Sequence, residues 1–198
     1  MKYKIVTQVL TEPVSLSEAR KHLRIEAFGS PAKHPDDRYV EGLIAASREW
    51  CEQYTRRALA TQTVDYALNG FPEVIELPLA PLQSVTSITY LDQAGTSQTL
   101  STSVYYIDYF DSKIYLNSNQ VWPATSNREN SVIVEYVAGY DEEDTPLPNP
   151  IKSAILLLVG SFYENRQEDQ MAGTRVSFNS LPMGVYNLLQ PYRLNLGV

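Results

Sequence analysis

The chain has 198 residues, of which 43% are hydrophobic, and 23 acidic against 16 basic residues give a formal net charge of −7. This length suits one domain with a real core. The acidic balance argues against a protein that grips nucleic acid, which needs clustered Lys and Arg. A single cysteine excludes an intramolecular disulfide and a cysteine-based zinc site, and it fits synthesis in a reducing cytoplasm. The N-terminus lacks the apolar stretch of a signal peptide.

Two helices are predicted in the first part of the chain. The first spans 14–25, where Ser15 and Glu18 follow a proline and form a capping box. The second spans 36–59, the longest stretch with helical periodicity, with acidic residues at its start and arginines at its end, as the helix dipole favours. A glycine- and proline-containing loop, 28–35, separates the two.

The periodicity changes from helical to two-residue alternation near Thr61 and changes back near Pro150. Turn residues and prolines divide this region into short strands, which we expect to form one antiparallel unit. The last strand is the clearest, because its alternate residues are all apolar on one face. The predicted strands are 61–68, 74–77, 84–91, 96–100, 105–109, 113–116 and 131–138.

The chain is organised around a helix predicted after the proline-rich connection 145–150. Asn149 is its expected N-cap, and Pro150 then occupies the first helical position. The helix is apolar nearly all round, which indicates a buried or membrane helix. Its unbroken apolar run, 154–159, is far shorter than the ~20 residues that a bilayer requires. We therefore expect a buried helix, covered by its own domain, by neighbouring subunits, or by both.

Helices followed by strands and then helices define an α+β fold: N-terminal helices, a central antiparallel β-region, a C-terminal buried helix and a short closing helix. We expect a single domain over 1–198. Its predicted parts are the helical part 14–59, the β-region 61–138, the buried helix 149–166, a mobile polar loop 167–180 and the closing helix 181–193.

No motif for catalysis, a cofactor or a metal is present. His22 and His34 are too few and too isolated for a metal site, and Cys51, on the apolar side of a helix, is expected to be an inert thiol. The acidic run 141–144 lacks the ligand spacing of a calcium loop and is expected to be solvated. Paired carboxylates, with Trp122 and nearby tyrosines, keep one alternative open: a small glycan-directed hydrolase. Tyr and Trp are equally typical of sheets and protein interfaces, which we favour.

Five stretches in this order resemble the head–tail connector (neck adaptor) family of tailed bacteriophages and prophages, over roughly 13–193. They are PVSLSEARKHLRI; DDRYVEGLIAASREWCEQYTRRAL leading into TQTVDYAL; LPLAPLQSVTSITYLDQAGTSQTL; VIVEYVAGY followed by LPNPIKSAILLLVGSFYENR; and LPMGVYNLLQPYR. Each is a common structural pattern, and their order and spacing together are specific. The chain departs from the family at 28–35 and 167–180.

The resemblance implies a structural protein of the virion neck, made in the bacterial host cytoplasm, with no enzyme activity, cofactor or membrane contact. It implies a ring of about twelve copies below the portal protein, linked to the next neck or tail protein. DNA would pass through the channel without tight binding, because carboxylates repel phosphates. A further alternative is another neck or tail completion protein, with a different docking partner. The residues expected at subunit or portal contacts are Trp50, Tyr54, Tyr163, Arg166 and Arg193.

Overall fold

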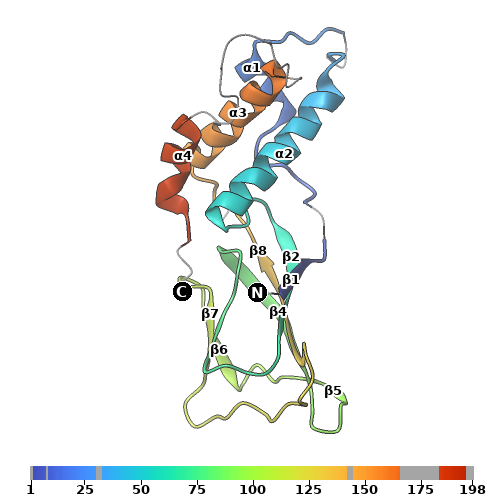
Figure 1. The fold of residues 1–198 in the computed structure, drawn as a ribbon, viewed down its shortest axis with the longest axis vertical. Helices are drawn as coiled ribbons and strands as arrows, with labels where there is room; N and C mark the ends of the chain where they lie inside the picture. Colours follow the sequence, from blue (N-terminus) through green and yellow to red (C-terminus); the bar gives the residue numbers. More distant parts are fainter. Residues whose placement is uncertain (1, 8, 30–32, 142–144, 166–182, 195–198) are drawn as a thin grey trace, which may run out of the picture. The chain divides into compact units, whose positions relative to one another are not determined.

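The computed structural model describes residues 2–7, 9–29, 33–141, 145–165 and 183–194 (Figure 1). The chain divides into two compact units. The β unit comprises Met1–Thr11 and Arg56–Thr145, and the helical unit comprises Glu12–Thr55 and Pro146–Val198. Helices and antiparallel sheets together confirm the α+β class. The elements are β1 Lys2–Ile5, α1 Leu16–Leu23, α2 Asp37–Thr55, β2 Gln62–Leu68, β3 Val74–Glu76, β4 Leu82–Leu91, β5 Ser97–Thr99, β6 Tyr105–Asp108, β7 Lys113–Leu116, β8 Val132–Ala138, α3 Asn149–Glu164 and α4 Met183–Leu189.

The strands of the β unit form two sheets, and every pairing between named strands is antiparallel. One sheet has five strands in the order β1-β2-β8-β4-β5, and the other has three in the order β3-β7-β6. β8 lies at the centre of the larger sheet and alternates as predicted, with Val132, Val134, Tyr136 and Ala138 fully buried. The smaller sheet buries Ile75 and Ile114, a directly opposed pair, on its inner face.

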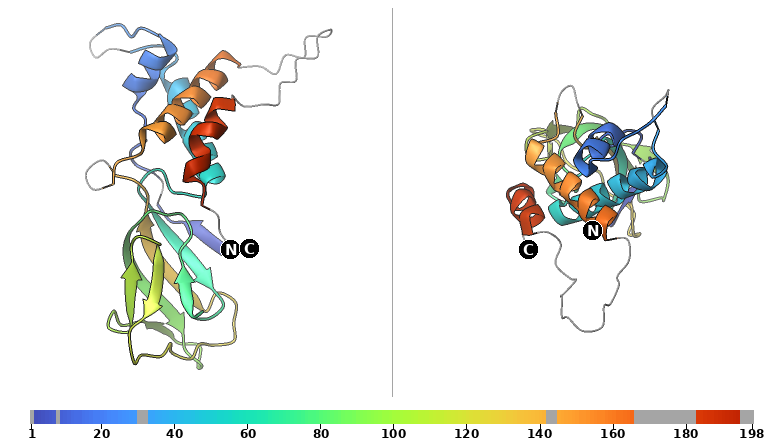
Figure 2. Two further views of the ribbon diagram at one scale, coloured as in Figure 1. Left: turned by 90° about the vertical axis from the view of Figure 1, so that its left-hand side faces the viewer. Right: turned by 90° about the horizontal axis from the view of Figure 1, so that it is seen from above.

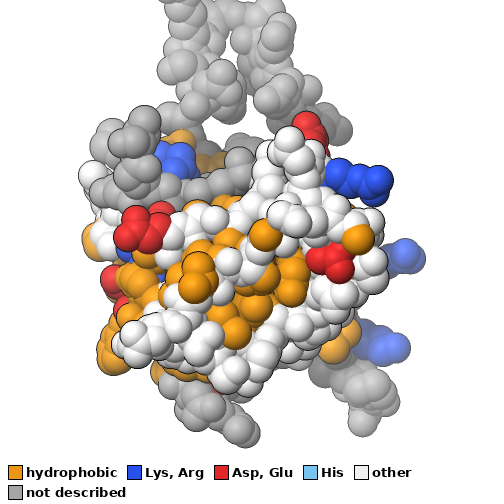
Figure 3. Space-filling model, turned by 90° about the horizontal axis from the view of Figure 1, so that it is seen from below, with side chains coloured by type: hydrophobic (Ala, Val, Ile, Leu, Met, Phe, Trp, Pro, Cys, Tyr) orange, Lys and Arg blue, Asp and Glu red, His pale blue; other side chains and the backbone are white. Residues whose placement is uncertain are grey.

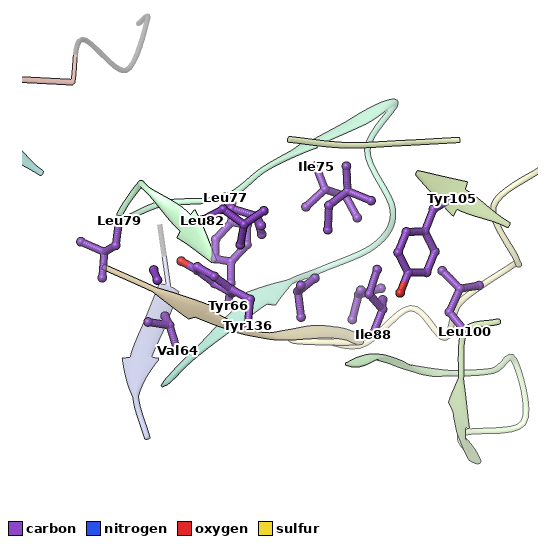
Figure 4. Close-up of a cluster of buried hydrophobic side chains, with 14 of the residues drawn as sticks. Val64, Tyr66, Ile75, Leu77, Leu79, Leu82, Ile88, Leu100, Tyr105 and Tyr136 are labelled. Carbon is purple, nitrogen blue, oxygen red and sulfur yellow. The ribbon is translucent and has the colours of Figure 1, made fainter. Parts of the chain in front are cut away.

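Both sheets contribute to one apolar core (Figure 4). In the close-up, Ile75 and Tyr105 from the smaller sheet point toward Ile88 and its neighbours from the larger sheet. Tyr136 is the largest fully buried side chain, and its hydroxyl donates a hydrogen bond to the carbonyl of Pro78. A buried tyrosine hydroxyl requires such a partner, since an unpaired polar group in an apolar core is costly.

The structure adds two features to the predicted β-region. β1 was not predicted, and it pairs antiparallel with β2, with Lys2 opposite Ala67 and Ile5 opposite Val64. β4 begins at Leu82, two residues earlier than predicted, and its pairing with β8 shifts register twice. Because each irregularity changes the alternation, Leu82, Val85 and Ile88, three residues apart, all pack against the core.

One glycine is required where β8 ends. Gly139 has φ +126°, and a Cβ built there would lie 2.2 Å from the carbonyl oxygen of Ala60. The Gly139 N–H also donates to the carbonyl of Pro81 at 2.9 Å. The backbones therefore approach more closely at this point than any side chain allows.

In the helical unit, the capping box of α1 is confirmed. The Glu18 N–H donates to Ser15 Oγ at 3.2 Å, and the Ser15 N–H donates to the Glu18 carboxylate at 2.9 Å. α2 ends at Thr55, four residues before its predicted end, because Arg56 adopts a left-handed conformation with φ 58°. Pro148, rather than Asn149, is the N-cap of α3.

α3 is only partly buried in a single chain. Five of its residues are buried: Ile151, Ala154, Ile155, Leu158 and Val159. They pack within the helical unit, where α3 contacts α1, α2 and α4. Leu157, on the other side, remains 36% exposed. The expectation of a buried helix therefore holds fully for one face, and the outer apolar face is only partly covered within the described residues.

Candidate subunit-contact site

Three of the five predicted contact residues lie together in the helical unit. Trp50 and Tyr54 are four residues apart on α2, and their rings stack with centroids 5.5 Å apart and an interplanar angle of 8°. Tyr186 of α4 packs edge-on against both, at 5.7 and 5.4 Å. The Arg193 guanidinium lies 5.4 Å from the centroid of the Tyr54 ring. We call Trp50, Tyr54, Tyr186 and Arg193 the aromatic cluster.

The aromatic cluster packs the closing helix, α4, against the C-terminal end of α2. The Leu194 N–H also donates a hydrogen bond to the Thr55 carbonyl at 2.9 Å, which fixes the segment after α4 to the last residue of α2. Val185 and Leu189 are fully buried and provide the apolar contact of α4. Gln190–Tyr192 continues the chain as a short 3-10 turn that contains Pro191, so the helical segment lies within the predicted span 181–193.

The cluster is also open to solvent on one side. Trp50 and Tyr54 are half-buried, and Tyr186 is 37% exposed. Aromatic side chains that are already fixed by neighbours lose little entropy on binding, and such residues are common at protein interfaces. Tyr186 was not predicted as a contact residue; its only sign in the sequence was an aromatic side chain off the apolar stripe of the closing helix.

The other two predicted contact residues are not part of the cluster. Tyr163, near the end of α3, donates its hydroxyl hydrogen to Asp36 Oδ2 at 2.6 Å, and its ring lies 6.2 Å from that of Tyr39. This places Tyr163 at the N-terminal end of α2, whereas Trp50 and Tyr54 lie toward the C-terminal end. Arg166 and the loop predicted at 167–180 lie outside the described residues.

Ion pairs hold the helices of this unit together. Arg48, 6% exposed, donates to Glu12 at 2.8 Å and to Glu52 at 2.7 Å. Burial alone would lower the pKa of Arg48, but the hydrogen bond with Glu12 and the negative charges around it raise that pKa above its ordinary value. The ammonium group of Lys152 on α3 lies 2.6 Å from the Glu18 carboxylate on α1 and lowers the pKa of Glu18 to about 2.

Cys51 and Trp122, considered above as candidates for catalysis or ligand binding, are packed in the protein interior or against its core. Cys51 is fully buried, and burial raises the pKa of its thiol to about 12, so it is not a nucleophile at neutral pH. Trp122 stacks on Phe71 at 4.8 Å with nearly parallel rings and packs against the β core. Within the described ranges, no three His, Cys, Asp or Glu side chains are grouped so that they could hold a metal ion.

A shallow, open cleft of about 480 Å³ lies between α1 and the start of α3. Lys21, His22 and Lys152 line it, and its one carboxylate, Glu18, is already paired with Lys152. A glycosidase needs two carboxyl groups across a cleft. This cleft therefore does not provide the site that the hydrolase alternative requires. Among the helices that the structure describes, none has the length and apolarity needed to cross a bilayer.

Comparison with solved structures identifies the fold. The chain is similar to a chain in the neck of an empty gene transfer agent (GTA) particle computed with C6 symmetry, with a TM-score of 0.78, 22% identity, and 100% of this chain and 98% of that chain covered. It is likewise similar to chains of a native GTA virion, with a TM-score of 0.77, and of a native GTA neck computed with C12 symmetry, with a TM-score of 0.75, at the same identity and coverage. At 22% identity these likenesses establish the fold.

The family is established by the sequence itself. A family model described as head completion protein matches residues 16–194, nearly the whole chain, and the chain belongs to this family. The resemblance to head–tail connectors is thereby confirmed, and the protein is a structural component of the head–tail connection. Neither finding supports a hydrolase. The curated proteins contain no match to the sequence.

Proposed function

We propose that the protein is the repeating subunit of a closed ring in the neck of a phage-like particle, docked below the portal protein and joined to the next neck or tail protein. The observation that carries this proposal is the match to the head completion family over 16–194. The similarity to neck chains treated with C6 and C12 symmetry supports a ring of about twelve copies. The function is one of binding and support, without a chemical step.

In this proposal the aromatic cluster lies at a contact with an adjacent subunit or the portal. Its open side offers aromatic surface and one cation, Arg193, which suit an interface. Leu157 on α3, which is 36% exposed, is proposed to supply a second apolar contact. Tyr163 is proposed to contribute at the opposite end of α2. Arg166 and the loop 167–180, which lie outside the described residues, are proposed to bind the neighbour or the portal.

DNA passes through the proposed ring without tight binding. The β unit holds six basic and twelve acidic residues, a net charge of −6, whereas the helical unit holds ten basic and eleven acidic residues, a net charge of −1. A surface with this excess of carboxylates repels phosphates. The acidic β unit is therefore proposed to line the channel, where it keeps the genome mobile.

Co-assembly with the cognate portal protein tests the proposal. Purified protein and portal are mixed, and the mass and symmetry of the product are measured by native mass spectrometry and electron microscopy. We expect closed rings on the portal, weakened by Trp50→Ala and unaffected by Phe28→Ala, a control aromatic residue of the same unit that is 69% exposed. A protein that stays monomeric beside its portal contradicts the proposal, and binding to a tail component alone favours a tail completion protein.

A further inference from the structure

Two strands of the β unit have an edge that no other described strand covers and that carries exposed apolar side chains. β1 ends the five-stranded sheet, and β6 ends the three-stranded sheet. β3 and β5 are also terminal strands, but β5 has only polar residues, Ser-Gln-Thr, and Ile75 of β3 faces the core. β1 and β6 are therefore the two edges with an apolar surface to bury.

The exposure of these two segments is unusual for the chain. Tyr3, Ile5 and Val6 at β1 are 46–48% exposed. At β6 and its turn, Tyr106 is 51% exposed, Tyr109 52% and Phe110 fully exposed. Six of the thirteen exposed large hydrophobic side chains in the described residues thus lie on these two short segments. Free edges with apolar side chains promote pairing with other chains, which proteins ordinarily prevent.

The two edges carry opposite charge. Residues 1–11 contain Lys2 and Lys4 and no acidic residue; Lys2 is paired with Glu129 at 2.8 Å, whereas Lys4 makes no ion pair within the described residues. Residues 101–112 contain Asp108 and Asp111 and no Lys or Arg, and Lys113 of β7 lies directly opposite Asp108. Like charges directly opposite each other destabilise a pair of strands. Pairing of β1 with β1, or of β6 with β6, is therefore disfavoured, and pairing of β1 with β6 is favoured.

Figure 1 and the left-hand view of Figure 2 show β1 and β6 on different sides of the β unit. Two different, complementary surfaces on one subunit form a heterologous interface, which closes into a ring when it is repeated. We propose that β1 of one copy adds to the β6 edge of the next copy, with main-chain hydrogen bonds, an ion pair between Lys4 and Asp111, and burial of the apolar side chains. This inference rests on the proposed ring.

The β unit has other apolar side chains besides those at its two edges. Figure 3 shows hydrophobic side chains gathered at the end of the molecule seen from below, with Asp, Glu, Lys and Arg mainly at the periphery. In the β unit, Phe71, Tyr90 and Trp122 pack on one another through ring contacts of 4.8 and 5.7 Å. These three rings already pack against one another, whereas the Phe110 ring has no aromatic partner among the described residues.

Thiol cross-linking tests the pairing directly. Ile5→Cys on β1 and Tyr106→Cys on β6 are made singly and together, and the assembled protein with its portal is treated with a short bismaleimide. Cys51 needs no replacement, because it is fully buried with a pKa of about 12 and does not react. We expect a ladder of covalent oligomers from the double variant, a heterodimer from a mixture of the two single variants, and no dimer from either single variant alone.

The control replaces the β6 position with Val121→Cys, an 81% exposed residue on a loop, combined with Ile5→Cys. This pair should give no ladder. A charge test adds a second readout: Lys4→Glu should weaken ring assembly about two- to fivefold, as loss of one exposed ion pair does, and Asp111→Lys in the same chain should restore it.

The outcomes separate this inference from the proposed function. If the native protein forms no ring with its portal, the proposed function and the edge pairing both fail. If rings form but the double variant gives no ladder, or Ile5→Cys alone gives dimers, the edge pairing is wrong and the ring stands.

Discussion

The hydroxyl of Tyr136 provides the sharpest test of the β core. In Tyr136→Phe the ring remains and the oxygen is lost, so the Pro78 carbonyl, which accepts its hydrogen bond, stays buried without that partner. A buried polar group left unpaired costs about 1–3 kcal/mol. For a protein of this size, each kcal/mol lowers the melting temperature by roughly 2–4 °C. We therefore expect Tyr136→Phe to melt roughly 2–12 °C below the native protein.

The matched control is Tyr66→Phe. Tyr66 lies on the adjacent strand β2, directly opposite Val134 and next to Tyr136, and it is 8% exposed. Its hydroxyl makes no hydrogen bond within the described residues, so the same chemical change should leave the melting temperature nearly unchanged. Melting is followed by circular dichroism and by urea titration, with equal urea m-values required. Equal stability of Tyr136→Phe and Tyr66→Phe would refute the role assigned to the Tyr136 hydrogen bond.

Three further predictions concern charge and backbone. Arg48→Met should lower the free energy of unfolding, measured by urea titration, by roughly 3–5 kcal/mol, because it leaves buried carboxylates uncompensated. Adding Glu52→Gln to this variant should restore part of the lost stability. If it restores none, the pairing of Arg48 with Glu52 is contradicted. The pKa of Glu18, about 2 against an ordinary 4.5, means that its charge stabilises the fold above pH 4.5 and that this contribution is lost as pH falls toward 2. Glu18→Gln should therefore flatten the pH dependence of stability in that window, and an unchanged profile would count against the ion pair with Lys152. Gly139→Ala should strongly reduce the yield of folded protein, whereas Gly42→Ala, at an open position on α2, should not; equal yields would show that the backbone there can move.

Local patterns predicted much of the fold. The Ser15–Glu18 capping box depends on two residues three positions apart, and both of its hydrogen bonds are present. The alternation of β8 depends only on the strand itself, and all four predicted inward residues are buried. Where local preference and tertiary packing agree, a single sequence is sufficient.

Nonlocal features were not predictable in this way. β1 alternates Lys-Tyr-Lys-Ile, but four residues are too short a run to identify a strand, and its pairing with Val64 and Tyr66 depends on residues far along the chain. The early end of α2 depends on Arg56 in a left-handed conformation, which usually requires glycine or asparagine. The division of the strands into two sheets depends on pairing order, which periodicity does not contain.

The candidate contact site shows the same limit. Trp50 and Tyr54 share a helix face by their spacing alone, so their stacking follows from the sequence. The approach of Tyr186 and Arg193 depends on how α4 packs on α2, and only the structure provides it. Tyr163, chosen with them, instead bonds to Asp36 at the other end of α2.

The distribution of charge constrains how such a ring can hold together. Each copy carries a net charge of −7, most of it in the β unit, so neighbouring copies repel one another. At physiological ionic strength this repulsion is screened beyond about 8 Å, whereas closely apposed groups still interact. Apolar burial at the β1 and β6 edges must therefore supply the cohesion, and the lysines and aspartates there determine which edges pair. Moderate salt should thus promote assembly, while high salt should reduce the preference for β1 against β6 over pairing of like edges.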